Sequence, residues 1–143
     1  MKPRVLPARL LPVLLLPALL SASFATFAQA AAAATTQRPA ENAGEWSIEF
    51  ERTAKSDGDI TFRVWPYDGA PIDVTVPVKQ GDTQNHTTVA FRDAFRKSLG
   101  SVDFRVNAVK NVISIASKRG ERRFGLELVK MDADGVNIDL GKR

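Results

Sequence analysis

Two groups of side chains in this sequence have the types and spacing that a binding site needs. The first is Arg63, Trp65 and Tyr67, which alternate along the stretch TFRVWPY at positions 61–67. If the intervening apolar residues point into a core, the alternation places all three outward together. An exposed Arg, Trp and Tyr can stack on sugar rings or anchor a protein partner. The alternative is that Pro66 ends the alternation and Trp65 turns back over the edge of the core.

The second group is a cluster of cations around one carboxylate on an expected hairpin tip. Four basic residues surround Glu121, namely Lys118, Arg119, Arg122 and Arg123. Such a cluster can bind a polyanion such as lipopolysaccharide, phosphate or nucleic acid. The alternative is a charged loop that keeps the neighbouring strands soluble and hinders edge pairing.

Catalytic and metal chemistry have few side chains to draw on. The chain contains one His, His86, and no Cys, so multi-His and thiolate metal sites, disulfides and thiol catalysis are excluded. No Gly-rich phosphate loop, G-x-S-x-G elbow or HExxH motif is present. The 16 acidic residues offer pairs for hydrolysis, although each has an ordinary surface or turn explanation. We therefore expect no cofactor and a non-enzymatic protein, with a small carboxylate-based hydrolase as the enzymatic alternative.

Residues 1–30 have the composition of an export signal. Three basic residues come first, an apolar stretch covers positions 10–20, and small residues lead to the motif Ala-Gln-Ala at 28–30. This order predicts a secretory signal peptide that is cleaved after Ala30. An uncleaved anchor is the alternative, but the apolar block is shorter than the about 20 residues that a membrane-spanning helix needs. We expect export to the periplasm or the medium, with no membrane span after cleavage.

Removing this leader changes the charge balance. The 143-residue chain carries 20 basic and 16 acidic residues, a net charge of +4. The leader holds three of the basic residues and none of the acidic ones, which leaves 17 and 16, a net charge of +1. A nucleic-acid binder that relies on overall positive charge therefore loses its support, and any polyanion site must be local.

The remaining sequence divides into an arm and one domain. Residues 31–44 lack apolar periodicity and contain Ala, Thr and Pro, which is typical of a flexible arm. Residues 45–143 form the expected single domain. The whole chain is 44% hydrophobic and 25% charged, as in a soluble globular protein, so it can form a core without disulfides.

Within that domain, short alternating segments surround one segment with helical spacing. Phe91, Phe95 and Leu99 recur every four residues before Gly100, which predicts a helix that begins near Thr83. Alternation predicts strands at 45–51, 60–64, 72–78, 102–108, 112–117, 122–131 and 136–140. The short links between strands require antiparallel neighbours. We therefore predict an α+β fold, a curved antiparallel sheet or open roll of about seven strands in the order βββ-α-ββββ, packed on one amphipathic helix.

These observations favour a secreted or periplasmic binding protein over an enzyme. The first hypothesis is that Arg63, Trp65 and Tyr67 contact a cell-envelope glycan or a protein partner. The second is that the basic residues between 118 and 123 bind a polyanion.

Overall fold

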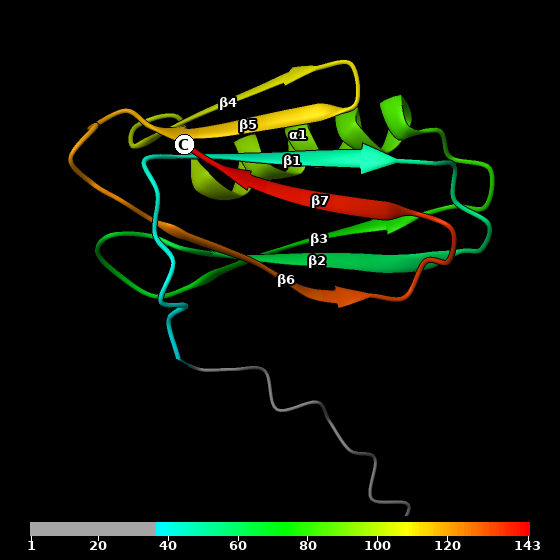
Figure 1. Ribbon diagram of the computed structural model, residues 1–143, viewed down its shortest axis with the longest axis horizontal. Coiled ribbons are helices and arrows are strands. Elements are labelled where there is room, and N and C mark those ends of the chain that lie inside the picture. The colour runs from blue at the N-terminus through cyan, green and yellow to red at the C-terminus, as the bar shows by residue number, and fades with distance from the viewer. Residues whose placement is uncertain (1–36) are drawn as a thin grey trace, which may run out of the picture. The chain divides into compact units, whose positions relative to one another are not determined.

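A computed structural model describes residues 37–143 of the chain. The expected signal peptide and the first part of the expected arm, up to residue 36, lie outside the described residues. The elements in chain order are β1 (Glu45–Glu51), β2 (Gly58–Trp65), β3 (Ile72–Val78), α1 (Gln84–Leu99), β4 (Phe104–Val109), β5 (Val112–Ser117), β6 (Gly125–Met131) and β7 (Asn137–Lys142). Figure 1 shows their arrangement.

The seven strands form two antiparallel sheets. One sheet has the order β4-β5-β1-β7 and the other the order β3-β2-β6. The predicted α+β class and the order βββ-α-ββββ are confirmed, and the strands do not close into a barrel. Sequence reasoning did not resolve the division into two sheets. It arises because β1 pairs with β5 and β7 from the far end of the chain and does not pair with β2.

The helix α1 fills the flank between β3 and β4. It begins after Thr83, whose side-chain oxygen accepts a hydrogen bond from the backbone amide of His86, and it ends before Gly100, which has a φ of 69°. The buried stripe includes Phe91 and Phe95, as the four-residue spacing predicted. At the outer edge of β4, the guanidinium of Arg96 donates two hydrogen bonds to the carbonyl of Val106, at 3.0 and 2.9 Å.

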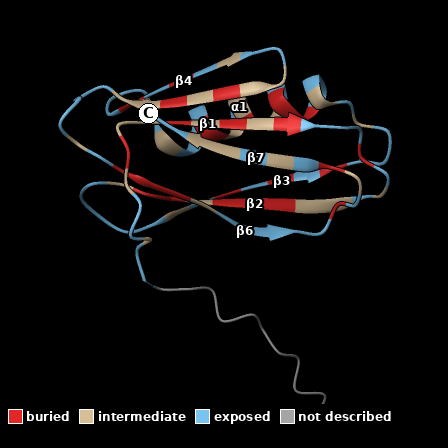
Figure 2. Ribbon diagram, viewed as in Figure 1, coloured by how far each residue is buried: buried red, intermediate tan, exposed pale blue. Residues whose placement is uncertain are grey.

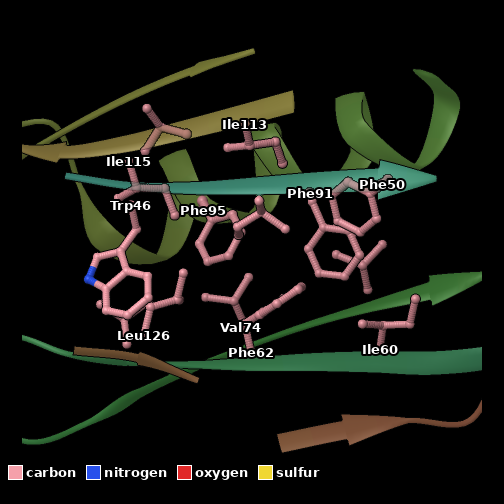
Figure 3. Close-up of a cluster of buried hydrophobic side chains, with 14 of the residues drawn as sticks. Trp46, Phe50, Ile60, Phe62, Val74, Phe91, Phe95, Ile113, Ile115 and Leu126 are labelled. Carbon is pink, nitrogen blue, oxygen red and sulfur yellow. The ribbon is translucent and has the colours of Figure 1, made fainter. Parts of the chain in front are cut away.

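The core lies between the two sheets and the helix. On β1 the alternation buries Trp46, Ile48 and Phe50, and Figure 2 shows buried residues recurring along β1 and β2. At its centre the ring of Phe91 stacks on Phe50 at 5.2 Å and meets Phe62 edge-on at 5.3 Å (Figure 3). Packed aromatic pairs of this kind add to the free energy gained from burying apolar area.

The second half of the expected flexible arm is bound to the domain. Ala43 and Phe124 exchange two backbone hydrogen bonds of 3.0 Å, and Ala43 is buried. The absence of apolar periodicity at 37–44 therefore did not mean that this segment was free, because a backbone bridge needs no side-chain pattern. Within residues 37–143 there is no helix long and apolar enough to cross a membrane.

Candidate binding site

Trp65 does not form part of an exposed platform. Only 8% of its surface is accessible, and its indole nitrogen donates a 3.0 Å hydrogen bond to Glu127 Oε1 on the neighbouring strand β6. The guanidinium of Arg63 lies 5.9 Å from the centre of the indole ring. The expectation that Arg63, Trp65 and Tyr67 face solvent together is therefore corrected. Trp65 does lie on the outer face of β2, but neighbouring side chains cover it there.

Arg63 forms a cross-strand ion pair on the same face. Its Nε and Nη2 donate to the two carboxylate oxygens of Asp73 at 2.6 and 2.8 Å, and these residues are direct register partners on β2 and β3. The hydrogen bond from Arg63 is the main reason that the pKa of Asp73 lies below its usual range. Only 11% of the Arg63 side chain is exposed, so this residue supports the sheet more than it presents a cation to a ligand.

Tyr67 lies beyond the end of β2, where Pro66 has ended the alternation. It is 56% exposed, the most exposed aromatic side chain in the described part of the chain. The guanidinium of Arg122 lies 5.6 Å from the centre of its ring, and an Arg122 nitrogen lies 3.4 Å from a carboxylate oxygen of Asp68. Tyr67 therefore lies beside Arg122, a residue of the basic group that the sequence analysis treated as a separate site. It does not share a surface with Trp65.

The basic residues from 118 to 123 do not form a hairpin tip. They belong to the link between β5 and β6, which lie in different sheets and do not pair. The cations are consequently divided among several neighbours. Lys118 donates to the carbonyl of Ser101, Arg119 lies 3.9 Å from Asp103, and Arg122 reaches the β2–β3 loop. The predicted single cluster is thus a set of separate cations at one end of the domain, each with its own neighbours.

Arg38 is a member of this site that sequence reasoning missed. Its guanidinium donates to the backbone carbonyls of Trp65, Tyr67 and Arg123 at 3.3–3.4 Å, and its Nε donates to the Asn42 side chain at 3.1 Å. One signal was present in the sequence, because no other charged residue lies between Arg9 and Glu41. A lone cation in a neutral arm is a candidate for a specific contact.

Three segments meet at this end of the domain, namely residues 37–44, the β2–β3 loop and the β5–β6 link. They are visible together at the left of Figure 1. They form a shallow depression of about 480 Å³, lined by Arg38, Ala40, Asn42, Tyr67 and Arg123. The lining holds two guanidinium groups, one aromatic ring and no carboxylate. It can therefore attract an anion and offer it a flat surface for stacking.

A second, smaller hollow shares Tyr67. It measures about 100 Å³, and its lining consists of Pro66, Tyr67, Asp68, Asp103, Phe104, Ser117, Arg122 and Phe124. Unlike the depression, it combines carboxylates, a guanidinium and aromatic rings. The two hollows together make up the candidate binding site.

Three acidic residues outside this site accept hydrogen bonds that support turns and the helix surface. The pKa values of Asp57, Asp82 and Asp93 are lowered by hydrogen bonds from backbone amides or from Arg92, in turns and on the helix surface. Among residues 37–143, no three acidic or His side chains are grouped closely enough to hold a metal ion. His86 is an exposed residue of the first helical turn, with Nδ1 2.7 Å from Asp82.

Comparison with protein-family models and with curated proteins found no matching family and no matching protein for this chain.

Proposed function

We propose that this chain is an exported, non-enzymatic binding protein that holds an acidic glycan of the cell envelope. The contact surface is the depression lined by Arg38, Asn42, Tyr67 and Arg123, with Arg122 beside the tyrosine ring. The observation that carries this proposal is the pairing of two guanidinium groups with an exposed ring, in a hollow that no carboxylate lines. Export rests on the composition of residues 1–30.

The chemistry of the depression suits an acidic sugar polymer. Guanidinium groups bind carboxylate and phosphate oxygens in a bidentate fashion, and an aromatic ring stacks on the apolar face of a pyranose. Arg123 is the strongest candidate for the anion, because no hydrogen bond or ion pair engages its side chain among residues 37–143. Arg38 contributes its charge while its hydrogen bonds hold it in place.

The site favours a glycan over nucleic acid as the polyanion. The basic residues between 118 and 123 are separated from one another. Three basic residues at this end of the domain are already close to acids, namely Arg119, Arg122 and Lys142. Nucleic-acid affinity depends on many phosphate contacts made together. This site has few free cations and one stacking ring. It therefore suits a polymer that binds through fewer charges and through contact with each sugar ring, as a glycan does.

Binding of polygalacturonate, a carboxylated polysaccharide, tests the proposal. We expect Arg123→Gln and Tyr67→Ala each to weaken binding about fivefold to tenfold in calorimetric titration, the loss of one charge-assisted or stacking contact. Lys110→Gln is the matched control, because Lys110 occupies the β4–β5 turn at the opposite end of the domain. Affinity should also fall when salt rises from about 50 to 200 mM. Equal binding by Arg123→Gln and the wild type, or no binding at low salt, would refute the proposal.

A further inference from the structure

The smaller hollow beside Tyr67 has a chemistry of its own. We infer that it accepts the acetamido group of an N-acetylated amino sugar, and so selects the glycan class that the depression binds. This inference rests on the proposed function. It adds a specific recognition element, which the charges of the depression cannot supply.

Several segments build this hollow, and hydrogen bonds hold them, beginning with the β2–β3 loop, where the carbonyl of Tyr67 accepts one from Arg38 at 3.3 Å. The β2–β3 loop contributes Tyr67 and Asp68, the turn before β4 contributes Asp103, the end of β5 contributes Ser117, and the β5–β6 link contributes Arg122. Backbone hydrogen bonds fix the link, since the Lys118 amide donates to the Asp103 carbonyl at 2.8 Å and the Arg122 amide to the Arg119 carbonyl at 2.8 Å. The hollow is therefore preformed, which lowers the entropic cost of binding.

The size of the hollow admits a substituent but not a whole ring. Its volume is about 100 Å³, which is smaller than an apolar cavity of ~150 Å³ that holds a benzene ring. A six-membered sugar ring must therefore stay outside, where the exposed ring of Tyr67 is available for stacking. Only a side group of that sugar can enter.

The lining specifies which side group fits. Phe104 and Phe124, whose rings meet edge-on at 5.1 Å, supply apolar surface and are themselves almost fully buried. The carboxylates of Asp68 and Asp103 accept hydrogen bonds, and the guanidinium of Arg122 donates them. An acetamido group matches all three features, because it carries a methyl group, an N–H donor and a carbonyl acceptor.

Other common sugar substituents match less well. A carboxylate would approach the two carboxylates of the lining and suffer repulsion. An ammonium group would be attracted to the two carboxylates, but it would lose its hydration against the aromatic rings and has no methyl group to cover them. A hydroxymethyl group has no apolar end to cover the phenylalanine rings.

Two neutral tetrasaccharides provide a matched test on the full mature chain. The β-1,4-linked tetramers of N-acetylglucosamine and of glucose differ only in the acetamido group at each ring. We expect the N-acetylated tetramer to bind about tenfold more tightly in calorimetric titration, because the glucose tetramer cannot form the hydrogen bonds of the acetamido group. Equal affinities, or no binding of the N-acetylated tetramer at millimolar concentration, would overturn the inference.

Variants connect this preference to the hollow. Asp68→Ala, in an exposed loop, should reduce the advantage of the N-acetylated tetramer to less than about threefold, because one acceptor is lost. Asp139→Ala on the exposed side of β7 removes an equal charge as a control and should leave the preference intact. If Asp68→Ala combined with Asp103→Ala preserves the full preference in a folded protein, the hollow is not the site.

The two proposals fail in different ways. Polygalacturonate has no acetamido groups, so its binding reports the depression alone. If it binds and the tetramers do not differ, only the inference about the acetamido group is wrong. If the N-acetylated tetramer binds and polygalacturonate does not, the acidic character of the glycan is wrong.

Discussion

Arg122 lies over the ring of Tyr67, with its guanidinium carbon 5.6 Å from the ring centre. The contact joins the β2–β3 loop to the β5–β6 link, which come from distant parts of the sequence. A carboxylate oxygen of Asp68 lies 3.4 Å from the same guanidinium. The aromatic and basic groups, separate in the sequence, therefore form one surface at the end of the domain.

Replacing Arg122 should affect binding more than stability. Arg122→Ala removes a cation–π contact and an exposed ion pair, each of which contributes about 1 kcal/mol or less to the free energy of unfolding. We expect a small shift in urea denaturation and a drop of several-fold in polygalacturonate affinity, because Tyr67 loses its support. Arg92→Ala, which removes a half-buried helical cation paired with the exposed Asp93, is the control for stability and should not change the affinity. Unfolding of Arg122→Ala at much lower urea would contradict this account.

Arg38→Ala should release the segment that precedes β1. The substitution removes the hydrogen bonds to the carbonyls of Trp65, Tyr67 and Arg123, which lie at or near the surface. We expect a loss of about 1–2 kcal/mol in the free energy of unfolding. Hydrogen exchange should quicken at the amides of Ala43 and Phe124, which bond to each other across this segment. Unchanged exchange at both amides would show that Arg38 does not hold the segment.

The two tryptophans should differ in the cost of losing their indole nitrogens. Trp46 Nε1 donates a buried 2.9 Å hydrogen bond to the carbonyl of Phe124, whereas Trp65 Nε1 donates to the partly exposed Glu127. Trp46→Phe leaves a buried acceptor with one bond fewer and a small cavity, so we expect a loss of about 2–4 kcal/mol.

Trp65→Phe is the matched comparison and should cost about 1 kcal/mol, because Glu127 can turn to water. Each variant keeps one tryptophan, so fluorescence during urea denaturation measures both. An equal loss for the two variants would contradict the difference in burial.

Acid should weaken the connection between β3 and α1. Asp57 accepts a hydrogen bond from the amide of Gln80 and Asp82 accepts one from the amide of Lys79, both at 2.8 Å. These backbone bonds are the largest cause of the lowered pKa of each carboxyl. Since the folded pKa lies below the unfolded value, their contribution is complete above about pH 4 and is lost as the pH falls further.

The melting temperature measured from pH 7 to pH 3 tests this point. The wild type should lose stability below pH 4, and Asp57→Asn combined with Asp82→Asn should lower the melting temperature at pH 7 and flatten the acid slope. Asp139→Asn is the control, as an exposed acid outside this connection. An acid slope that the double variant leaves unchanged would assign acid sensitivity to other groups.

The sequence predicted the elements well because their signals are local. The helix followed from Phe91 and Phe95 at four-residue spacing, and β1 from alternation around Trp46. The division into two sheets depends on long-range pairs such as Ile48 with Leu140, for which no local pattern exists. The short β5–β6 link suggested a hairpin, but this link instead crosses from one sheet to the other.

The site was less predictable, because side-chain cover is a tertiary property. Alternation placed Trp65 on the outer face of β2, but its burial depends on Arg63 and also on Glu127, which lies on the neighbouring strand β6 and is distant in the sequence. Tyr67 is exposed only because Pro66 ends the strand first. The depression also needs Arg38, which lies in a segment without periodicity.

The position of α1 has a consequence for contacts between copies of this chain. The helix flanks both β3 and β4, and Arg96 already occupies the outward carbonyl of Val106. In the described part of the chain, β6 and β7 are the sheet ends without such cover, and β6 exposes Leu128 and Met131. We therefore expect any self-association through strand addition to involve this flank alone, which leaves the end that carries the candidate binding site clear of it.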